Sequence, residues 1–265
     1  MQSMDTIIRK TLLYKTAVEY GDYTANHVLG CAHGCNFPCY AFNMAKRFGN
    51  VKTYSEWIKP RLVANALDLL DKELPKLAGK IESIHLCFTT DPFMDEYPEV
   101  QDMSIKMIHR INHYHIPVVV LTKGTLPYEL SQTFKGNQFG ITLVSLSEQF
   151  RKVYEPFSST YNQRIEALEK LHNTGCQTWV SIEPFPTPNI GDTPIEDILH
   201  RVAFVDKIVF GRLHYNKKVG EYKGYQNFYN ETARKVIEFC QASHKKCHIK
   251  HGTYIQDGQI IDIDF

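Results

Sequence analysis

Short runs rich in β-branched residues alternate along the chain with longer segments of helical periodicity. Val63, Ala66, Leu67 and Leu70 repeat at i, i+3, i+4 and i+7, which predicts an amphipathic helix. Further helices are predicted near residues 101–113, 163–173 and 231–242, and one begins at residue 41. Strands are predicted at residues 26–30, 84–88, 117–123, 141–147, 177–184 and 206–213, with a seventh at 247–252.

This alternation is typical of βαβ crossovers and therefore of a parallel sheet. About six repeats predict an α/β fold of the partial (β/α)6-type barrel. No internal repeat, low-complexity tract or linker divides the chain. We therefore expect an N-terminal extension at 1–24, a partial barrel at 25–215, and a C-terminal extension at 216–265 that completes the barrel.

Composition narrows the class of protein only slightly. The chain has 265 residues, of which 43% are hydrophobic and 22% charged, as is ordinary for a globular protein. Thirty basic against 29 acidic side chains give no support for nucleic acid as a partner. The N-terminal residues lack a secretory pattern, and no 18 apolar residues run together, so we expect a cytoplasmic protein without a membrane partner.

The most informative motif is GCAHGCNFPCY, which holds Cys31, Cys35 and Cys39. Three thiolates at this spacing are typical of a metal centre, and they leave one iron of a four-iron, four-sulfur cluster without a protein ligand. The alternative is a structural zinc site built from the three cysteines and His33. Zinc usually takes paired cysteines from two separate places, whereas these thiols lie in one loop.

Polar residues also follow the other predicted strands. In a barrel the active site lies at the carboxyl ends of the strands, so these side chains are expected to meet there. For any one of them, the structural alternative is a cap on the following helix. They are Thr89, Thr90, Asp91, Lys123, Ser145, Ser147, Glu183, Arg212, His214 and Lys250.

The cysteine motif, together with CFTTDPF, VVVLTKG, ITLVSLS and EPFSSTYNQRIEALEKLHNTG, resembles the radical S-adenosylmethionine (SAM) superfamily, in a branch related to spore photoproduct lyase. The resemblance implies a partial barrel, a [4Fe-4S] cluster and S-adenosyl-L-methionine as cofactors, and a 5′-deoxyadenosyl radical that abstracts hydrogen from a substrate. An electron donor such as flavodoxin or ferredoxin is implied as a partner. The common spacing of three and then two residues between the cysteines is three and three here.

The same resemblance implies roles for individual residues. The segment Thr89, Thr90 and Asp91 matches the part that receives the methionine amino group. Lys123 matches a lysine that pairs with the methionine carboxylate, and Ser145 a serine that assists it. Glu183 is a candidate for the ribose hydroxyls or the substrate, and Arg164 is expected to pair across a helix surface, outside the site.

The substrate stays open, with repair of a DNA photoproduct as the alternative reaction and a zinc-stapled binding module as the non-enzymatic one. In spore photoproduct lyase, a hydrogen-donor cysteine directly precedes the motif that matches residues 89–91. That position holds Phe88 here, and Cys87 lies one residue earlier. Because side chains alternate along a strand, Cys87 is expected to point outward toward the helices. We therefore expect no repair of spore photoproduct.

Overall fold

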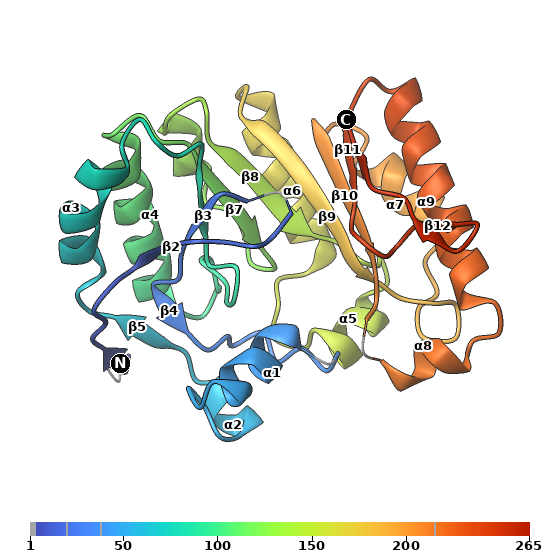
Figure 1. The fold of residues 1–265 in the computed structure, drawn as a ribbon, viewed down its shortest axis with the longest axis horizontal. Helices are drawn as coiled ribbons and strands as arrows, with labels where there is room; N and C mark the ends of the chain where they lie inside the picture. The colour runs from blue at the N-terminus through green and yellow to red at the C-terminus, as the bar shows by residue number, and fades with distance from the viewer. Residues whose placement is uncertain (1–3, 20, 38, 215) are drawn as a thin grey trace.

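A nine-stranded sheet forms the frame of the molecule in the computed structural model, which describes residues 4–19, 21–37, 39–214 and 216–265 (Figure 1). Its pairs from β3 to β11 are parallel, and the outermost strands β2 and β14 pair antiparallel. The predicted partial α/β barrel is therefore confirmed, with seven parallel strands. In order across the sheet, the strands are β2 (Leu13–Lys15), β3 (Tyr23–Ala25), β6 (Ile84–Leu86), β7 (Val118–Thr122), β8 (Gln138–Thr142), β9 (Gln177–Phe185), β10 (Lys207–Arg212), β11 (Lys246–Ile249) and β14 (Ile263–Asp264).

Helices cover the outer face of this sheet and bury one continuous apolar core against it (Figure 1). Each predicted helix is present, although the last begins earlier than predicted. The long helices are α3 (Ala66–Leu77), α4 (Pro98–Asn112), α6 (Tyr161–Asn173) and α9 (Tyr225–Ala242), and the shorter ones are α1 (Tyr40–Arg47), α2 (Tyr54–Trp57), η1 (Tyr128–Gln132), α5 (Glu148–Tyr154), α7 (Ile195–Arg201) and α8 (Lys217–Glu221). No helix within the described residues is both long and apolar enough to cross a membrane.

Two predicted strands lie elsewhere than expected. The first barrel strand is β3, whereas Val28–Leu29 forms β4, which leaves the barrel and pairs with β5 (Arg61–Val63). A third short strand, β1 (Thr6–Ile7), completes this small sheet, and β12 (Ile255–Gln256) and β13 (Gln259–Ile260) form a separate hairpin. The strand predicted at 141–147 is β8, and it ends at Thr142.

Gly140 explains why the start of β8 escaped prediction. Glycine weakens a strand, but a side chain here has no room, because a Cβ would lie 2.4 Å from the Trp179 ring. We expect Gly140→Ala to destabilise the protein by about 1–3 kcal/mol through overpacking, measured by urea unfolding. Gly220 in α8 has no neighbour within 4 Å of such a Cβ. Gly220→Ala should therefore be neutral or stabilising, and an equal loss in both variants would contradict the role of Trp179.

The N-terminal segment between β2 and β3 reaches across the sheet to its other end. The Glu19 carboxylate lies 2.8 Å from Nε2 of His248 in β11 and accepts a hydrogen bond from the His251 amide at 3.1 Å. Neighbouring Val18 lines the cavity described below. The segment before β3 thus meets the last parallel strand beside the barrel mouth.

Candidate cofactor site

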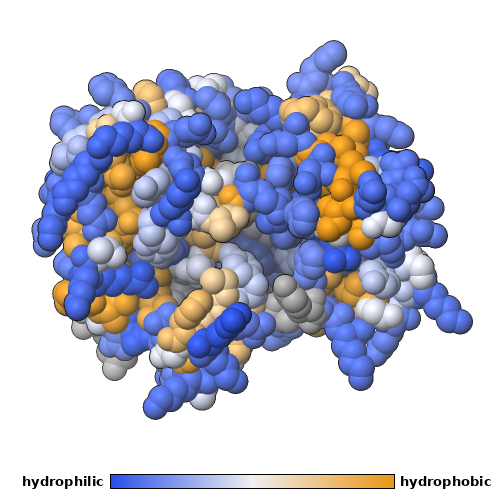
Figure 2. Space-filling view, in the orientation of Figure 1, coloured by the Kyte–Doolittle hydropathy of each residue, from blue (hydrophilic) through white to orange (hydrophobic). Residues whose placement is uncertain are grey.

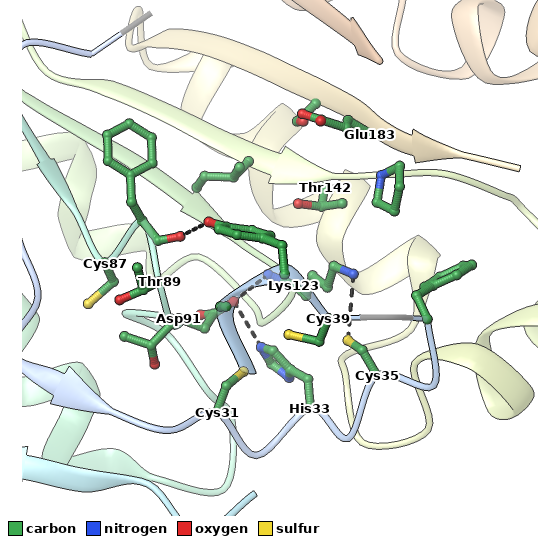
Figure 3. Close-up of a pocket in the computed structure, with 18 of the residues that line it drawn as sticks. Cys31, His33, Cys35, Cys39, Cys87, Thr89, Asp91, Lys123, Thr142 and Glu183 are labelled. Atoms are coloured by element: carbon green, nitrogen blue, oxygen red, sulfur yellow. Dashed lines mark hydrogen bonds and ion pairs between the residues drawn. The ribbon is translucent and has the colours of Figure 1, made fainter. Parts of the chain in front are cut away.

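A cavity of about 730 Å³ opens at the carboxyl ends of the parallel strands. Figure 2 shows the corresponding face of the molecule, hollowed near its centre. All three cysteines of the predicted motif line this cavity, and so do residues from the ends of β6, β7, β9, β10 and β11 (Figure 3). Of the predicted site residues, Thr89, Thr90, Asp91, Lys123 and Glu183 are in its wall, and Ser145 is not.

The cysteine loop is held from several sides. The Cys31 amide donates to the Trp57 carbonyl at 2.9 Å, and the Tyr54 hydroxyl donates to the Cys35 carbonyl at 2.7 Å. The ring of Phe37 stacks on Tyr154 of α5 with centroids 4.8 Å apart. These contacts anchor the loop backbone between α2 and α5.

Gly30 makes the turn into this loop. Its φ of +95° lies in the region that L-residues rarely adopt, and a Cβ would lie 2.6 Å from the Trp57 carbonyl oxygen. The Thr90 hydroxyl donates to the Gly30 carbonyl. The chain leaving β4 is thereby tied to the segment that follows β6.

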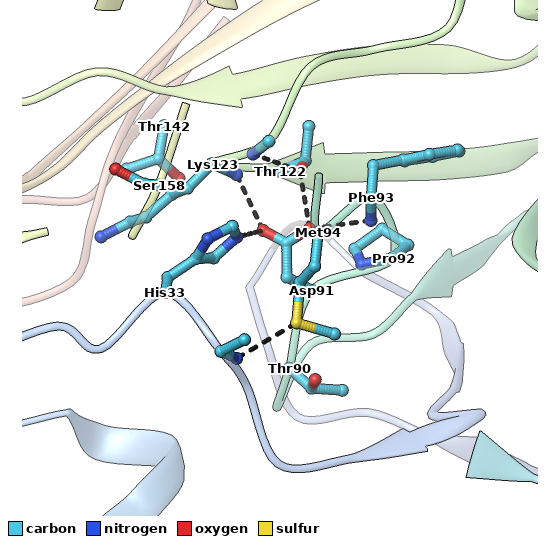
Figure 4. Close-up of polar contacts among 12 residues, drawn as sticks. His33, Thr90, Asp91, Pro92, Phe93, Met94, Thr122, Lys123, Thr142 and Ser158 are labelled. Atoms are coloured by element: carbon cyan, nitrogen blue, oxygen red, sulfur yellow. Dashed lines mark hydrogen bonds and ion pairs between the residues drawn. The ribbon is translucent and has the colours of Figure 1, made fainter. Parts of the chain in front are cut away.

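Asp91 is the centre of a buried polar network (Figure 4). One carboxylate oxygen accepts from the Phe93 amide at 2.8 Å and the Thr122 hydroxyl at 2.6 Å. The other accepts from the Lys123 amide at 2.8 Å and lies 2.8 Å from His33 Nε2. Burial favours the neutral acid, but these partners outweigh it and lower the pKa of Asp91. The carboxylate thus joins the cysteine loop to the ends of β6 and β7.

A second buried network links Lys123 to α6. Lys123 Nζ lies 2.6 Å from one Glu155 oxygen and 3.6 Å from the Cys35 sulfur (Figure 3), and Arg164 binds the other Glu155 oxygen at 2.8 Å. Burial opposes ionisation of Glu155, but the two cations outweigh it and lower its pKa to about 2. Burial alone would lower the pKa of Lys123, yet the facing Cys35 and Glu155 raise it. The expected surface pairing of Arg164 is wrong, because this side chain is fully buried.

Sequence reasoning missed Glu155, although a signal for its partner was present. Tyr161, Arg164, Leu168 and Leu171 share one face of α6, so the arginine interrupts an otherwise apolar stripe. A charge on the buried face of a helix requires a partner of opposite charge.

The loop thiols are suited to a cluster. Burial raises the pKa of Cys31 well above its ordinary value and that of Cys35 to about 11, so metal binding has to release protons from them. In a cluster each thiolate binds a different iron, so the three sulfurs need not converge on one point. Among the described residues, no three His, Cys, Asp or Glu side chains are grouped to hold a single metal ion. The spacing of these three thiols is thus compatible with a cluster.

His33 also weighs against the zinc alternative. It is 2% exposed, its Nε2 is directed at Asp91, and its Nδ1 lies 3.5 Å from the Phe157 carbonyl. Both ring nitrogens thus face protein groups other than the thiols.

Ser145 occupies a different place from the one predicted. It is fully buried in the loop after β8, where its hydroxyl lies 2.8 Å from that of Thr193 and accepts from the Ser147 amide. Ser147 caps α5. Since β8 ends at Thr142, the hydroxyl residue of this strand that lines the cavity is Thr142 rather than Ser145. Ser181 of β9 lines the cavity beside it.

Glu183 lies near the end of β9, on the side of the cavity away from the cysteine loop (Figure 3). Its carboxylate lies 3.7 Å from Lys250 Nζ, and burial raises its pKa despite this cation. Gly211 leaves room for both side chains, since a Cβ there would lie 2.9 Å from each of their Cγ atoms.

Cys87, labelled in Figure 3, contacts His27 with its sulfur but is also among the residues that line the cavity, so its predicted outward orientation stays a prediction. The sulfur lies 3.4 Å from His27 Nδ1, and His27 Nε2 lies 2.8 Å from the Ser104 hydroxyl of α4. The alternation of side chains along a strand does not set the direction of the Cys87 side chain, because β6 ends at Leu86 and Cys87 has a left-handed φ of +60°. Burial lowers the pKa of His27 to about 4, so this histidine is neutral.

Known proteins share both sequence and fold with this chain. It is 26% identical over 180 residues to the uncharacterized protein ORF301 of Acidianus two-tailed virus, and 24% identical over 172 residues to the uncharacterized protein MJ0683 of Methanocaldococcus jannaschii. The matches cover 63% and 64% of this chain, but only 57% and 62% of those two relatives.

A solved structure of a spore photoproduct lyase mutant, with bound AdoMet and dinucleoside spore photoproduct, superposes with a TM-score of 0.63. It covers 94% of this chain and 81% of that one at 13% identity, a likeness of fold alone. The sequence profile of the radical SAM superfamily matches residues 25–202. Because this match contains the cysteine loop and the strand ends from β6 to β9, and extends over most of the chain, the protein belongs to the radical SAM superfamily.

Proposed function

We propose that this protein is an enzyme that binds a [4Fe-4S] cluster through Cys31, Cys35 and Cys39 and uses S-adenosyl-L-methionine to abstract hydrogen from a substrate. The main support is that the three thiols and the polar strand ends open onto one cavity. When bound together, cluster and cofactor supply a 5′-deoxyadenosyl radical. The protein's part is to orient the cofactor and the substrate and to exclude water.

The methionine end of the cofactor is proposed to bind at the ends of β6 and β7. The hydroxyls of Thr89 and Thr90 line the cavity and can accept from an ammonium. Asp91 was predicted to do the same, but each of its oxygens already has two protein partners. We therefore propose that Asp91 positions the loop and leaves the ammonium to its neighbours.

Lys123 is proposed to bind the methionine carboxylate. Its ammonium has three N–H donors, and Glu155 uses one of them, so a second carboxylate can be accommodated. Glu155 then holds the ammonium in place. Ser145 takes no direct part in this proposal, and Thr142 is the nearer hydroxyl on β8. Glu183 is proposed to face the ribose hydroxyls or the substrate.

The contacts of Cys87 argue against repair of a DNA photoproduct. A thiol that returns hydrogen to a substrate radical has to face the substrate, whereas the Cys87 sulfur is engaged with His27 and the residue, although it lines the cavity, is only 3% exposed. The substrate is therefore proposed to differ from spore photoproduct. A cytoplasmic location and an electron donor such as flavodoxin or ferredoxin stay predictions.

Reductive cleavage of the cofactor tests this function. Protein purified and reconstituted with iron and sulfide under anaerobic conditions should be brown, and with dithionite and SAM it should form 5′-deoxyadenosine, quantified by liquid chromatography and mass spectrometry. The cleavage should be absent without the reductant. A colourless protein that retains zinc and forms no 5′-deoxyadenosine would support the binding-module alternative instead.

A further inference from the structure

The side chains that line the cavity include more cations than carboxylates. Four cationic side chains line the cavity, Arg47, Lys123, Arg212 and Lys250, against the two carboxylates of Asp91 and Glu183. Burial raises the pKa of Glu183, which weakens the negative contribution further. An oxidised [4Fe-4S] cluster bound by three thiolates has a formal charge of the opposite sign to that of SAM. Binding of both therefore leaves the excess of positive side-chain charge in the cavity unchanged.

Two of these cations have no carboxylate within 4.0 Å among the described residues: Arg47, which is exposed at the end of α1, and Arg212, which is partly buried. Lys123 is paired with Glu155, and Lys250 lies 3.7 Å from Glu183. No carboxylate within the described part of the chain lies within 4.0 Å of the Arg212 guanidinium. A partly buried guanidinium is usually matched by an oxyanion.

Two neutral groups hold this guanidinium in place. Its Nε lies 3.4 Å from His214 Nε2, and one terminal nitrogen lies 3.4 Å from the Gln226 side-chain oxygen. Burial, with the charges of Arg212 and Lys250, lowers the pKa of His214, so this imidazole is neutral and accepts the Nε–H. The other terminal nitrogen passes beside Gly252, where even a Cβ would lie 3.8 Å away. The Arg212 guanidinium is thus held in one orientation and still has N–H groups that can donate to a ligand.

We propose that Arg212 binds an oxyanion of the substrate, a carboxylate or a phosphate, at the carboxyl end of β10. Lys250 at the end of the adjacent β11 supplements its charge. The identification of this oxyanion as part of the substrate rests on the proposed function. The oxyanion site itself needs neither iron nor SAM, so the two ideas can fail separately.

Binding of small oxyanions tests the site. We expect the protein, both without cluster and after cluster loading with SAM, to bind inorganic phosphate or succinate in calorimetric titrations at constant ionic strength, and the stronger of the two identifies the oxyanion. Arg212→Gln should weaken this binding at least about tenfold, since a charge-assisted bidentate contact is lost. Arg201→Gln, on the exposed end of α7, is the matched control and should bind as the wild type does.

A second measurement uses the unaltered protein. Phosphate or succinate should slow modification of Arg212 by phenylglyoxal, mapped by peptide mass spectrometry, and leave the rate at Arg201 unchanged. Equal oxyanion affinity in wild type and Arg212→Gln, without protection of Arg212, would overturn the proposal. So would weakened SAM binding in Arg212→Gln at unchanged oxyanion affinity, which would assign the guanidinium to the cofactor.

Discussion

Each of the variants Cys31→Ala, Cys35→Ala and Cys39→Ala should lose most of the iron that the anaerobically reconstituted protein binds. Each thiolate is proposed to hold a different iron, and a four-iron cluster left with two protein ligands is readily lost. The loop backbone is anchored by Trp57, Tyr54 and Tyr154, so the variants should still fold. Iron and acid-labile sulfide, with the visible absorption of the cluster, measure the effect.

The other cysteines supply matched controls. Cys176 and Cys240 are buried in the core away from the cavity wall. Cys176→Ala and Cys240→Ala should keep their iron, although each loses some stability by leaving a small void. Full iron content in any of the three loop variants would refute the ligand assignment.

Removing the Glu155 carboxylate should cost about 3–5 kcal/mol of unfolding free energy. Glu155→Ala leaves Lys123 and Arg164 as buried like charges without their common partner. Urea unfolding of the protein without cluster gives the loss directly. The surface pair of Glu196 with Lys235 is the control, because Glu196→Ala should cost no more than about 1 kcal/mol. Equal losses of unfolding free energy in Glu155→Ala and Glu196→Ala would mean that burial does not make the Glu155 ion pairs more important for stability than a surface pair.

The same carboxylate predicts a pH dependence. Its folded pKa, about 2, lies below the ordinary value of 4.5, so its contribution is fully present above pH 4.5 and is lost as the pH falls toward 2. In Glu155→Gln this titrating group is absent. The difference in stability between wild type and Glu155→Gln should therefore narrow over that range, and a constant difference would contradict the assigned pKa.

Periodicity was sufficient to predict the barrel, because the long helices bury one face each and the parallel strands are short apolar runs that are buried on both faces. It failed where packing overrides local preference. Gly140 lies in β8 although glycine weakens a strand, and the Trp179 ring fills the space beside it. Val28–Leu29 has the apolar character of a barrel strand but pairs in the small sheet. Such choices depend on partners distant in sequence.

The cysteine loop was predictable from spacing, and Lys123 and Thr89 from their position after strands. The roles of Asp91 and Ser145 were not, because they depend on partners that become neighbours only in the folded chain. Asp91 faces His33 across the barrel mouth, and Ser145 meets Thr193 behind it. The buried ion pair of Glu155 with Arg164 was likewise not predictable, because its two residues come together only when α6 packs on the barrel.

The contact between Glu19 and His248 spans 229 residues of sequence. Contacts between such distant segments form late, since loop-closure entropy has to be overcome before they contribute. During synthesis, the strands up to β10 can assemble before β11 leaves the ribosome. The barrel mouth then stays open on the side of Glu19, and a nascent chain exposes the cysteine loop to solvent until its last strands arrive. If the loop binds the proposed cluster, its access to iron would be widest before Glu19 and His248 meet.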